Sequence, residues 1–251
     1  KKMQLNKSQI LKICKLAWIA GEKILDIYSK EFQIFKKKDM SPVTLADLES
    51  EKIIIKGLNK IFKKPIIVSE ETNNKNIDNI KNFWLIDPLD GTKEFIKKND
   101  EFTINIAFIH KKKPILGIIY APVLKKTYAA INKSTYKIIN KKRFKKIILK
   151  KSLKKIMIIS RSHSSKKEEL KLIKKYKIEK VLYVGSALKF CYVAEGRAHI
   201  YPRSGITYEW DTAAGHAIIN GVGGIVETSK GNELKYGKKN FKNTNFVAKI
   251  F

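Results

Sequence analysis

Two aspartates within the run Asp-Pro-Leu-Asp-Gly-Thr, at residues 87–92, form the part of the sequence best suited to chemistry. The apolar residues 83–86 before them predict a buried strand that ends at Asp87. Proline restricts the backbone after Asp87, so the Asp90 carboxylate and the Leu89 carbonyl can face the same point. Carboxylate and carbonyl oxygens, completed by phosphate and water, are the ligands that Mg²⁺ prefers. The run therefore predicts a site for a hard divalent cation.

The two residues that end this run suit a phosphate group. Gly91 permits a close approach of the backbone, and Thr92 is expected to open a short helix. The free N–H groups and the dipole at the start of a helix favour an anion. Asp-Pro and Asp-Gly pairs are also common in ordinary turns. A turn alone does not require the whole six-residue run, so we favour the metal and phosphate interpretation.

A second aspartate motif is Trp-Asp-Thr-Ala-Ala-Gly at 210–215. Asp211 stands where a helix N-cap is expected, and capping is its ordinary structural role. The small residues that follow would let this helix pack close to the site. The motif gains weight because it occurs together with the first one.

Three further acidic residues could complete the site. Glu70 and Glu71 follow a short apolar run, so at least one of them can point into a cleft at the end of a strand. Asp47 lies three residues after Thr44, a predicted helix cap. The ordinary alternatives are solvated surface for the glutamates and a first-turn aspartate, stabilised by the helix dipole, for Asp47.

The elements that must position these side chains follow from hydrophobic periodicity and turn signals. In the first half we predict helices from Ser8 and from near Thr44, and strands at 65–68, 83–86, 103–109 and 115–120. In the second half we predict strands at 156–159, 181–184 and 199–201, helices at about 166–176 and 187–195, and a helix that follows Asp211 and ends at Gly221. The lysine-rich segment 132–155 is predicted to be a surface connection flanked by short strands. The chain thus divides into an α+β half, 1–150, and an α/β half, 151–251, packed tightly together.

The formal net charge of +30 suggests a polyanion partner, but the kind of basic residue argues against specific nucleic-acid binding. Only four of the 53 basic residues are arginines, and the lysines are scattered over nearly every segment. Sequence-specific readers use arginine forks and clustered patches. The pattern favours compositional drift, with a weak attraction to an anionic membrane surface as the remaining consequence.

Cellular location and redox state follow from what the sequence lacks. Cys14 and Cys191 lie far apart in apolar patterns, so they are expected to be buried free thiols. The sequence shows no apolar run of membrane-spanning length and no signal peptide. We expect a cytoplasmic protein, at most peripheral on the cytoplasmic face of the inner membrane. Monomer and homodimer both remain open.

Together these motifs resemble the inositol monophosphatase superfamily of lithium-sensitive, magnesium-dependent phosphomonoesterases. Residues 87–92 and 210–215 match its two motifs, Glu70 its strand-end glutamate, and Asp47 the aspartate of a Val-Thr-x-x-Asp element. Further runs are similar to the bacterial 3′(2′),5′-bisphosphate nucleotidases; they lie at 89–95, 160–163, 185–190 and 201–203. The resemblance covers essentially the whole chain and implies a layered α/β/α/β/α sandwich.

The resemblance also implies roles for individual residues. Glu70, Asp87 and the Leu89 carbonyl would hold a first Mg²⁺, and Asp87, Asp90 and Asp211 a second. A third, weaker ion would lie near Glu70, which also counts among the catalytic residues. Asp47 and Thr92 would form the dyad that activates water. The implied substrate contacts are Leu89, Asp90, Gly91, Thr92, His163, Ser186, Lys189, Arg203 and Asp211.

The substrate implied is adenosine 3′,5′-bisphosphate, cleaved to AMP and phosphate, with 3′-phosphoadenylyl sulfate as a second one. Such an enzyme would recycle a by-product of sulfur assimilation. Two alternatives stay open: hydrolysis of inositol monophosphate or fructose 1,6-bisphosphate, and a basic polyanion-binding module without catalysis. The complete set of carboxylates argues against the second, because uncompensated buried acids are costly. Lys189, His163 and Arg203 argue against the first alternative, because they favour a nucleotide with a second phosphate.

Overall fold

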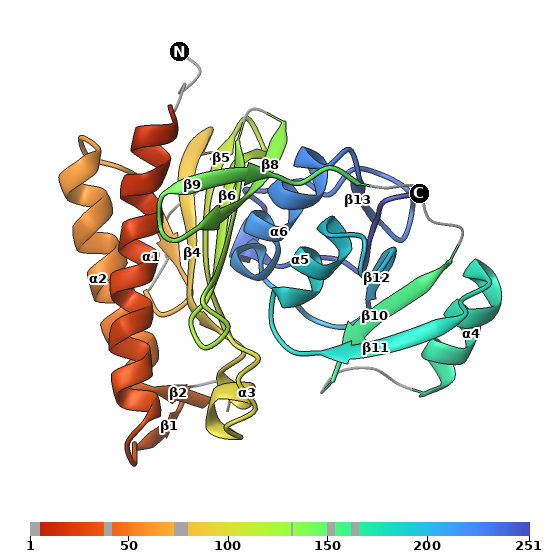
Figure 1. Cartoon of the computed structure of the whole chain (residues 1–251), viewed down its shortest axis with the longest axis horizontal. Coiled ribbons are helices and arrows are strands. Elements are labelled where there is room, and N and C mark those ends of the chain that lie inside the picture. Colours follow the sequence, from red (N-terminus) through yellow and green to blue (C-terminus); the bar gives the residue numbers. More distant parts are fainter. Residues whose placement is uncertain (1–5, 38–41, 73–79, 132, 150–153, 162–165) are drawn as a thin grey trace.

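A computed structural model of the chain describes residues 6–37, 42–72, 80–131, 133–149, 154–161 and 166–251. Figure 1 shows five layers, which run from α2 and α1 on one side to α4 on the other. A helix pair, a seven-stranded sheet, a second helix pair, a five-stranded sheet and a single helix follow one another. The layered α/β/α/β/α sandwich expected from the sequence is confirmed.

The seven-stranded sheet has the order β3-β4-β5-β6-β7-β8-β9. Its strands are β3 (Ile67–Ser69), β4 (Asn82–Asp90), β5 (Thr103–His110), β6 (Lys113–Ala121), β7 (Lys126–Ile131), β8 (Ser134–Ile139) and β9 (Arg143–Lys146). β3 runs parallel to β4, whereas the other neighbours pair antiparallel, including the predicted hairpin of β5 and β6. Because β3 and β4 are parallel neighbours, their carboxyl ends lie side by side at one end of the sheet. Glu70 and Asp87 are brought together there.

Two long helices cover the outer face of this sheet. They are α1 (Lys7–Tyr28) and α2 (Leu45–Ile61), and the short antiparallel strands β1 (Ile34–Lys36) and β2 (Pro42–Thr44) lie between them in the chain. Their apolar sides share one core with the sheet, in which Trp84 is nearly fully buried. Thr44 caps α2, as predicted, and accepts a hydrogen bond from the Ala46 N–H. The first turn of α2 therefore holds Asp47 in a buried position next to the sheet.

The five-stranded sheet has the order β11-β10-β12-β14-β13. Its strands are β10 (Ile156–Ser160), β11 (Lys180–Val184), β12 (Ile200–Arg203), β13 (Ile225–Thr228) and β14 (Phe246–Lys249). β10 pairs parallel with β11 and β12, and β14 pairs antiparallel with β12 and β13. α4 (Lys166–Tyr176) covers the outer face, where Met157, Ile159 and Ile200 form a small core. Strands and helices alternate along the chain from β10 to α6 (Glu209–Gly221).

The helices between the sheets are α5 (Leu188–Ala194) and α6 (Glu209–Gly221), and their side chains share one core with both sheets. α6 lies very close to β6, because a Cβ added at Gly117 would come within 2.4 Å of the Ala214 carbonyl oxygen. Likewise, a Cβ at Gly215 would come within 2.2 Å of the Phe190 ring on α5. The small residues of the second motif therefore let α6 pack closely, as predicted.

Two predictions need correction. The lysine-rich segment 132–155 contains β8 and β9, which continue the sheet to its edge, where exposed lysines discourage pairing with other chains. Asp211 is the third residue of α6, not its cap, since the helix begins at Glu209. The strands β7, β13 and β14 were not anticipated either.

Within the described part of the chain, no helix combines the length and apolar character needed to cross a bilayer.

Candidate active site

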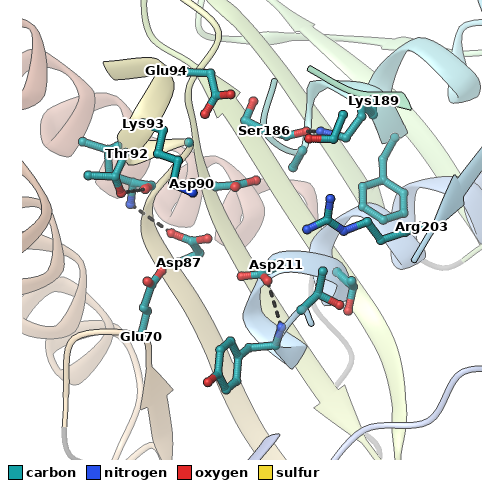
Figure 2. Close-up of a pocket in the computed structure, with 18 of the residues that line it drawn as sticks. Glu70, Asp87, Asp90, Thr92, Lys93, Glu94, Ser186, Lys189, Arg203 and Asp211 are labelled. Atoms are coloured by element: carbon teal, nitrogen blue, oxygen red, sulfur yellow. Dashed lines mark hydrogen bonds between the residues drawn. The ribbon is translucent and has the colours of Figure 1, made fainter. Parts of the chain in front are cut away.

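A cleft of about 290 Å³ lies where the ends of β3, β4, β12 and the first turn of α6 meet. Its walls include nearly all the residues predicted from the sequence: Glu70, Asp87, Leu89, Asp90, Gly91, Thr92, Ser186, Lys189, Arg203 and Asp211. Figure 2 shows the carboxylates of Glu70, Asp87 and Asp211 facing one another, with Lys189 and Arg203 farther along the cleft. His163 lies outside the described residues. The structure thus places an acidic end and a basic end in one cavity.

Backbone contacts fix the Asp-Pro-Leu-Asp turn at the end of β4. The Leu89 N–H donates to Asp87 Oδ1 at 3.1 Å, and Ser50 Oγ donates to the Pro88 carbonyl at 2.7 Å. The pairing of β4 with β5 shifts register between Asp87 and Asp90, so both carboxylates reach the cleft from one strand. Asn105 of β5 donates to Asp90 Oδ2 at 3.2 Å. Asn105 was missed, although a buried amide in an apolar strand was a usable signal.

Three carboxylates converge at the acidic end. One oxygen each from Glu70, Asp87 and Asp211 lies within 4.8 Å of the others, and no second group of this kind occurs among the described residues. The Tyr208 N–H donates to Asp211 Oδ2 at 2.8 Å and orients that carboxylate. Asp90 stands outside this group. Glu70 directly follows β3, whereas Asp87 belongs to β4 and Asp211 to α6, so the larger sheet and the helix between the two sheets build the cluster jointly.

The carboxylates perturb one another strongly. Burial, followed by the charges of Glu70, Asp90 and Asp211, raises the pKa of Asp87 well above its usual value. Burial and the charges of Asp90 and Glu70 do the same for the pKa of Asp211. Burial raises the pKa of Asp90 to about 6. A divalent cation would remove this repulsion and match the oxygen donors, so the cluster fits a hard metal ion.

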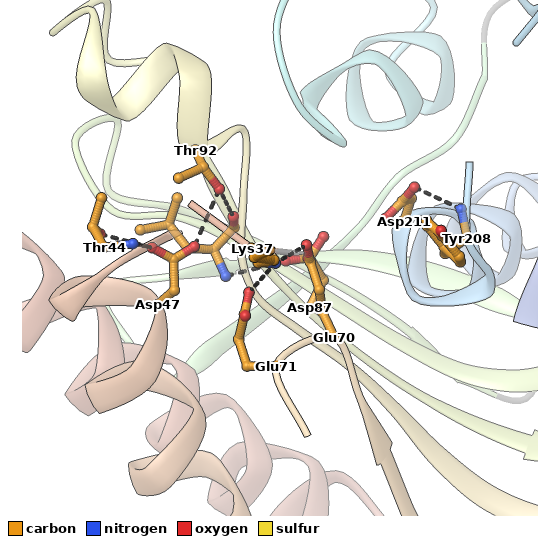
Figure 3. A network of polar contacts seen from close by, with 10 residues as sticks. Lys37, Thr44, Asp47, Glu70, Glu71, Asp87, Thr92, Tyr208 and Asp211 are labelled. Atoms are coloured by element: carbon orange, nitrogen blue, oxygen red, sulfur yellow. Dashed lines mark hydrogen bonds and ion pairs between the residues drawn. The ribbon is translucent and has the colours of Figure 1, made fainter. Parts of the chain in front are cut away.

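Lys37 is the principal residue that sequence reasoning missed. Its Nζ lies 2.7 Å from Glu70 Oε1 and 2.6 Å from Glu71 Oε1 (Figure 3). Burial lowers the pKa of Lys37, but the charges of the two glutamates outweigh it and raise the value above normal. Burial also raises the pKa of Glu71 to about 7. The ammonium therefore supplies positive charge at the edge of the acidic cluster.

Asp47 and Thr92 form a hydrogen-bonded pair behind the cluster (Figure 3). Asp47 Oδ2 accepts bonds from the Thr44 N–H at 2.8 Å and from the Thr44 hydroxyl at 2.7 Å. Asp47 Oδ1 remains for the Thr92 hydroxyl, which lies 3.1 Å away. The same hydroxyl is 3.3 Å from the Leu89 carbonyl oxygen. The helix cap thus fixes one oxygen of the carboxylate and directs the other toward the cleft.

Gly91 brings the two halves of the cleft together. Its φ of 94° lies in the left-handed region, where a side chain is strained. A Cβ at this position would come within 3.0 Å of the Glu101 carbonyl oxygen and 3.2 Å of Ser186 Cβ. The short helix α3 (Thr92–Ile96) starts directly after it, as predicted. Glycine is therefore required both for the turn and for the approach of Ser186.

The basic end is built by Lys189 and Arg203. Lys189 is 4% exposed, and its Nζ donates to the Val184 carbonyl at 3.2 Å and to the Ser186 carbonyl at 2.5 Å. An ammonium has three donors, so one remains for another acceptor. Burial lowers the pKa of Lys189 to about 8. Among the described residues, none accepts a bond from the buried Arg203 Nε. Lys189 therefore keeps one donor for a ligand, and Arg203 lines the same cleft.

A fold of alternating helix and sheet layers, with this acidic cluster at the edge of the larger sheet, defines a known class of protein. The chain belongs to the inositol monophosphatase family, whose model matches residues 6–249. The resemblance and the fold predicted from the sequence are both confirmed.

Particular relatives narrow the comparison. The 3′(2′),5′-bisphosphate nucleotidase CysQ of Buchnera aphidicola subsp. Acyrthosiphon pisum is 45% identical over 245 residues, covering 94% of this chain and 92% of the relative. The CysQ of Escherichia coli strain K12 is 40% identical over 246 residues, covering 95% and 98%. The crystal structure of CysQ from Bacteroides thetaiotaomicron matches with a TM-score of 0.82 at 34% identity, covering 97% of both chains.

Proposed function

We propose that this chain is a metal-dependent phosphomonoesterase that removes the 3′-phosphate of adenosine 3′,5′-bisphosphate, yielding AMP and phosphate. 3′-Phosphoadenylyl sulfate is proposed as a second substrate. The observation that carries the proposal is the identity of 40–45% to nucleotidases over 94–95% of this chain. The cleft agrees with it in chemistry, because one end is acidic and the other basic. A nucleotide with two phosphates matches both ends.

We propose magnesium as the metal, because the donor set consists of carboxylate and carbonyl oxygens. Glu70, Asp87 and the Leu89 carbonyl would hold one ion, and Asp87, Asp90 and Asp211 a second. A third, weaker ion would use Glu70. When bound, magnesium neutralises charge on the reacting phosphate and makes a neighbouring water more acidic. The raised pKa values of the acidic cluster support this proposal, since they reflect negative charge that lacks full compensation.

The proton of the attacking water is assigned to the Asp47–Thr92 pair. Thr92 Oγ1 can accept that proton while it gives its own to Asp47 Oδ1, at 3.1 Å. The Thr44 contacts keep Asp47 in the orientation that this transfer requires. Burial raises the pKa of Asp47, so the carboxylate is a better base than an exposed aspartate. Asp47 would act through Thr92, because Asp47 does not itself line the cleft.

The second phosphate is assigned to the basic end of the cleft. The remaining donor of Lys189, the Arg203 guanidinium and the Ser186 hydroxyl would bind the non-reacting 5′-phosphate. Charged donors around a dianion give strong, charge-assisted hydrogen bonds. Inositol monophosphate has no second phosphate for this end.

The weak membrane association expected from the net charge stays a prediction.

Phosphate release tests the proposal directly. Purified protein with Mg²⁺ would be given adenosine 3′,5′-bisphosphate, 3′-phosphoadenylyl sulfate, inositol 1-phosphate and fructose 1,6-bisphosphate, each with a chelator control. We expect the highest kcat/KM for the bisphosphonucleotide and no release in chelator. A higher kcat/KM for inositol 1-phosphate or fructose 1,6-bisphosphate would overturn the assignment.

A further inference from the structure

Arg161 and Glu101 connect the two halves of the chain, and Arg161 directly follows Ser160, which lines the cleft. Arg161 follows β10, and Glu101 lies in the loop between α3 and β5. The ion pair is bidentate, with Nε at 3.1 Å from Oε2 and Nη2 at 2.8 Å from Oε1. This parallel geometry is the most specific that an arginine and a carboxylate can form. The proposed function gave neither residue a role.

Both partners also hold the backbone at the end of β11. Glu101 Oε2 accepts the Gly185 N–H at 2.7 Å, and Arg161 Nη2 donates to the Tyr183 carbonyl at 2.8 Å. No side chain fits at Gly185, because a Cβ there would come within 2.6 Å of Glu94 Cγ and 2.9 Å of the Glu101 carbonyl oxygen. The path of residues 183–185 is therefore fixed against the first half of the chain.

The basic end of the cleft is built on this fixed backbone. Ser186 follows Gly185 with a φ of 49°, in the left-handed region that a serine seldom adopts. The Lys189 ammonium is bound to the carbonyls of Val184 and Ser186. The position of the ammonium therefore depends on that of the backbone on either side of Gly185. A shift of this backbone would move Ser186 and Lys189 together.

We propose that Glu101 and Arg161 are positioning residues that set the preference for a nucleotide carrying a 5′-phosphate. The proposal rests on the proposed function, because it concerns the end of the cleft assigned to the non-reacting phosphate. Neither residue is assigned a contact with the substrate. They hold the 183–186 backbone so that Ser186 and Lys189 converge on that phosphate. The acidic cluster lies at the other end of the cleft and does not depend on this ion pair.

The two partners carry opposite charges, and this makes the test sharp. Glu101→Gln removes a negative charge and Arg161→Gln removes a positive one. If the pair acted only through its electric field, the first change would strengthen and the second would weaken the binding of an anion. If it acts by positioning, both changes weaken binding. We expect each variant to raise KM for adenosine 3′,5′-bisphosphate about three- to tenfold, with kcat nearly unchanged.

The same variants should hydrolyse 3′-AMP, which lacks the 5′-phosphate, with the wild-type kcat/KM. Arg197→Gln is the matched control, because Arg197 is as exposed as Arg161, at 48% against 49%, and also pairs with a glutamate. It should change neither substrate. The double variant should lose less than the product of the two single effects, because the shared ion pair is lost only once. Melting temperatures of all variants would show that the fold is retained.

Equal losses on both substrates, or KM shifts of opposite sign in the two single variants, would overturn the inference. AMP binding, measured by calorimetry in chelator, provides a readout that needs no turnover. Without metal the acidic cluster repels the phosphate of AMP, which leaves the basic end as its binding place. We expect both variants to weaken AMP binding about three- to tenfold without changing adenosine binding. Unchanged AMP affinity would overturn the inference even if phosphate release supported the function. Wild-type protein that binds AMP but releases no phosphate would contradict only the proposed function.

Discussion

The Thr92 hydroxyl reaches Asp47, 45 residues earlier in the chain, at 3.1 Å. The pair joins the first turn of α2 to the first turn of α3, at the end of β4. Thr44 uses up the second carboxylate oxygen of Asp47. An N-terminal capping interaction thus also orients the carboxylate that we propose as the general base. Such a double use explains why the cap and the aspartate occur together in the sequence as Val-Thr-Leu-Ala-Asp.

Replacing Thr92 should separate proton transfer from binding. Thr92→Val keeps the shape of the side chain but removes the hydroxyl, so we expect kcat to fall about 10²–10⁴-fold, the usual size of acid–base assistance. KM should change little. Thr92→Ser is the matched control and should retain most activity. Steady-state kinetics with adenosine 3′,5′-bisphosphate decides this, and full activity of the valine variant would remove Thr92 from the proton path.

Asp90→Asn should abolish turnover without weakening the metal-free fold. Asp90 lies beside charged carboxylates, so removing its charge relieves repulsion even as a ligand is lost. In chelator the melting temperature should stay equal or rise, and Mg²⁺ should stabilise the variant less than the wild type. Thermal melts over a magnesium series measure both effects. Wild-type stabilisation by Mg²⁺ in the variant would exclude Asp90 as a ligand.

The stability gained from Mg²⁺ should depend on pH. Acids with a raised folded pKa bind protons more tightly in the folded state, so the metal-free protein loses stability as pH rises from about 4, the unfolded value, through the folded pKa. For Asp90 that upper value is about 6. Magnesium binds the ionised carboxylates, so the rise in melting temperature that it causes should grow between about pH 5 and about pH 7.

One histidine must be separated from this effect. Burial lowers the pKa of His216 to about 3, so its contribution to stability is lost as pH falls below its unfolded value of about 6.5. That trend is present with and without magnesium and cancels in the difference between the two melts. A magnesium effect independent of pH would contradict the proposed ligand set.

Lys37→Gln should destabilise the metal-free protein. The side chain of Lys37 is 20% exposed and pairs with two glutamates, so we expect a loss of about 1–3 kcal/mol in unfolding free energy, between the values for exposed and buried pairs. Magnesium should recover most of this loss, because it supplies the missing charge. Lys52→Gln, at an exposed lysine that also pairs with a glutamate, is the control. Equal losses with and without Mg²⁺ would limit Lys37 to a structural role.

The success and failure of sequence reasoning have separate physical causes. The Asp-Pro-Leu-Asp-Gly-Thr turn could be predicted because Pro88 and Gly91 shape it locally and the Leu89 N–H bonds to Asp87 within it. Lys37 could not, because its partners lie 33 and 34 residues away and it is one lysine among dozens. The site residues could thus be predicted where their contacts are made with neighbours in sequence.

The same division applies to the fold. β4, β5 and β6 carry long apolar runs, whereas β8 and β9 mix apolar residues with lysine because they lie at or next to a sheet edge. Their mixed composition gave no apolar run from which β8 and β9 could be predicted. Asp211 was predicted as the helix cap but lies three positions after it, since a cap and a third helical residue favour the same amino acid at the same helix end.

The close approach of α6 to β6 has a consequence for mutations far from the cleft. At Gly117 the backbone of the helix touches the sheet with no side chain between them. A methyl group added at this glycine would act as a wedge and lift the helix whose first turn carries Asp211. The Gly117→Ala wedge would lower metal affinity although it leaves every carboxylate in the sequence, so an inactive homologue could show a complete set of motifs.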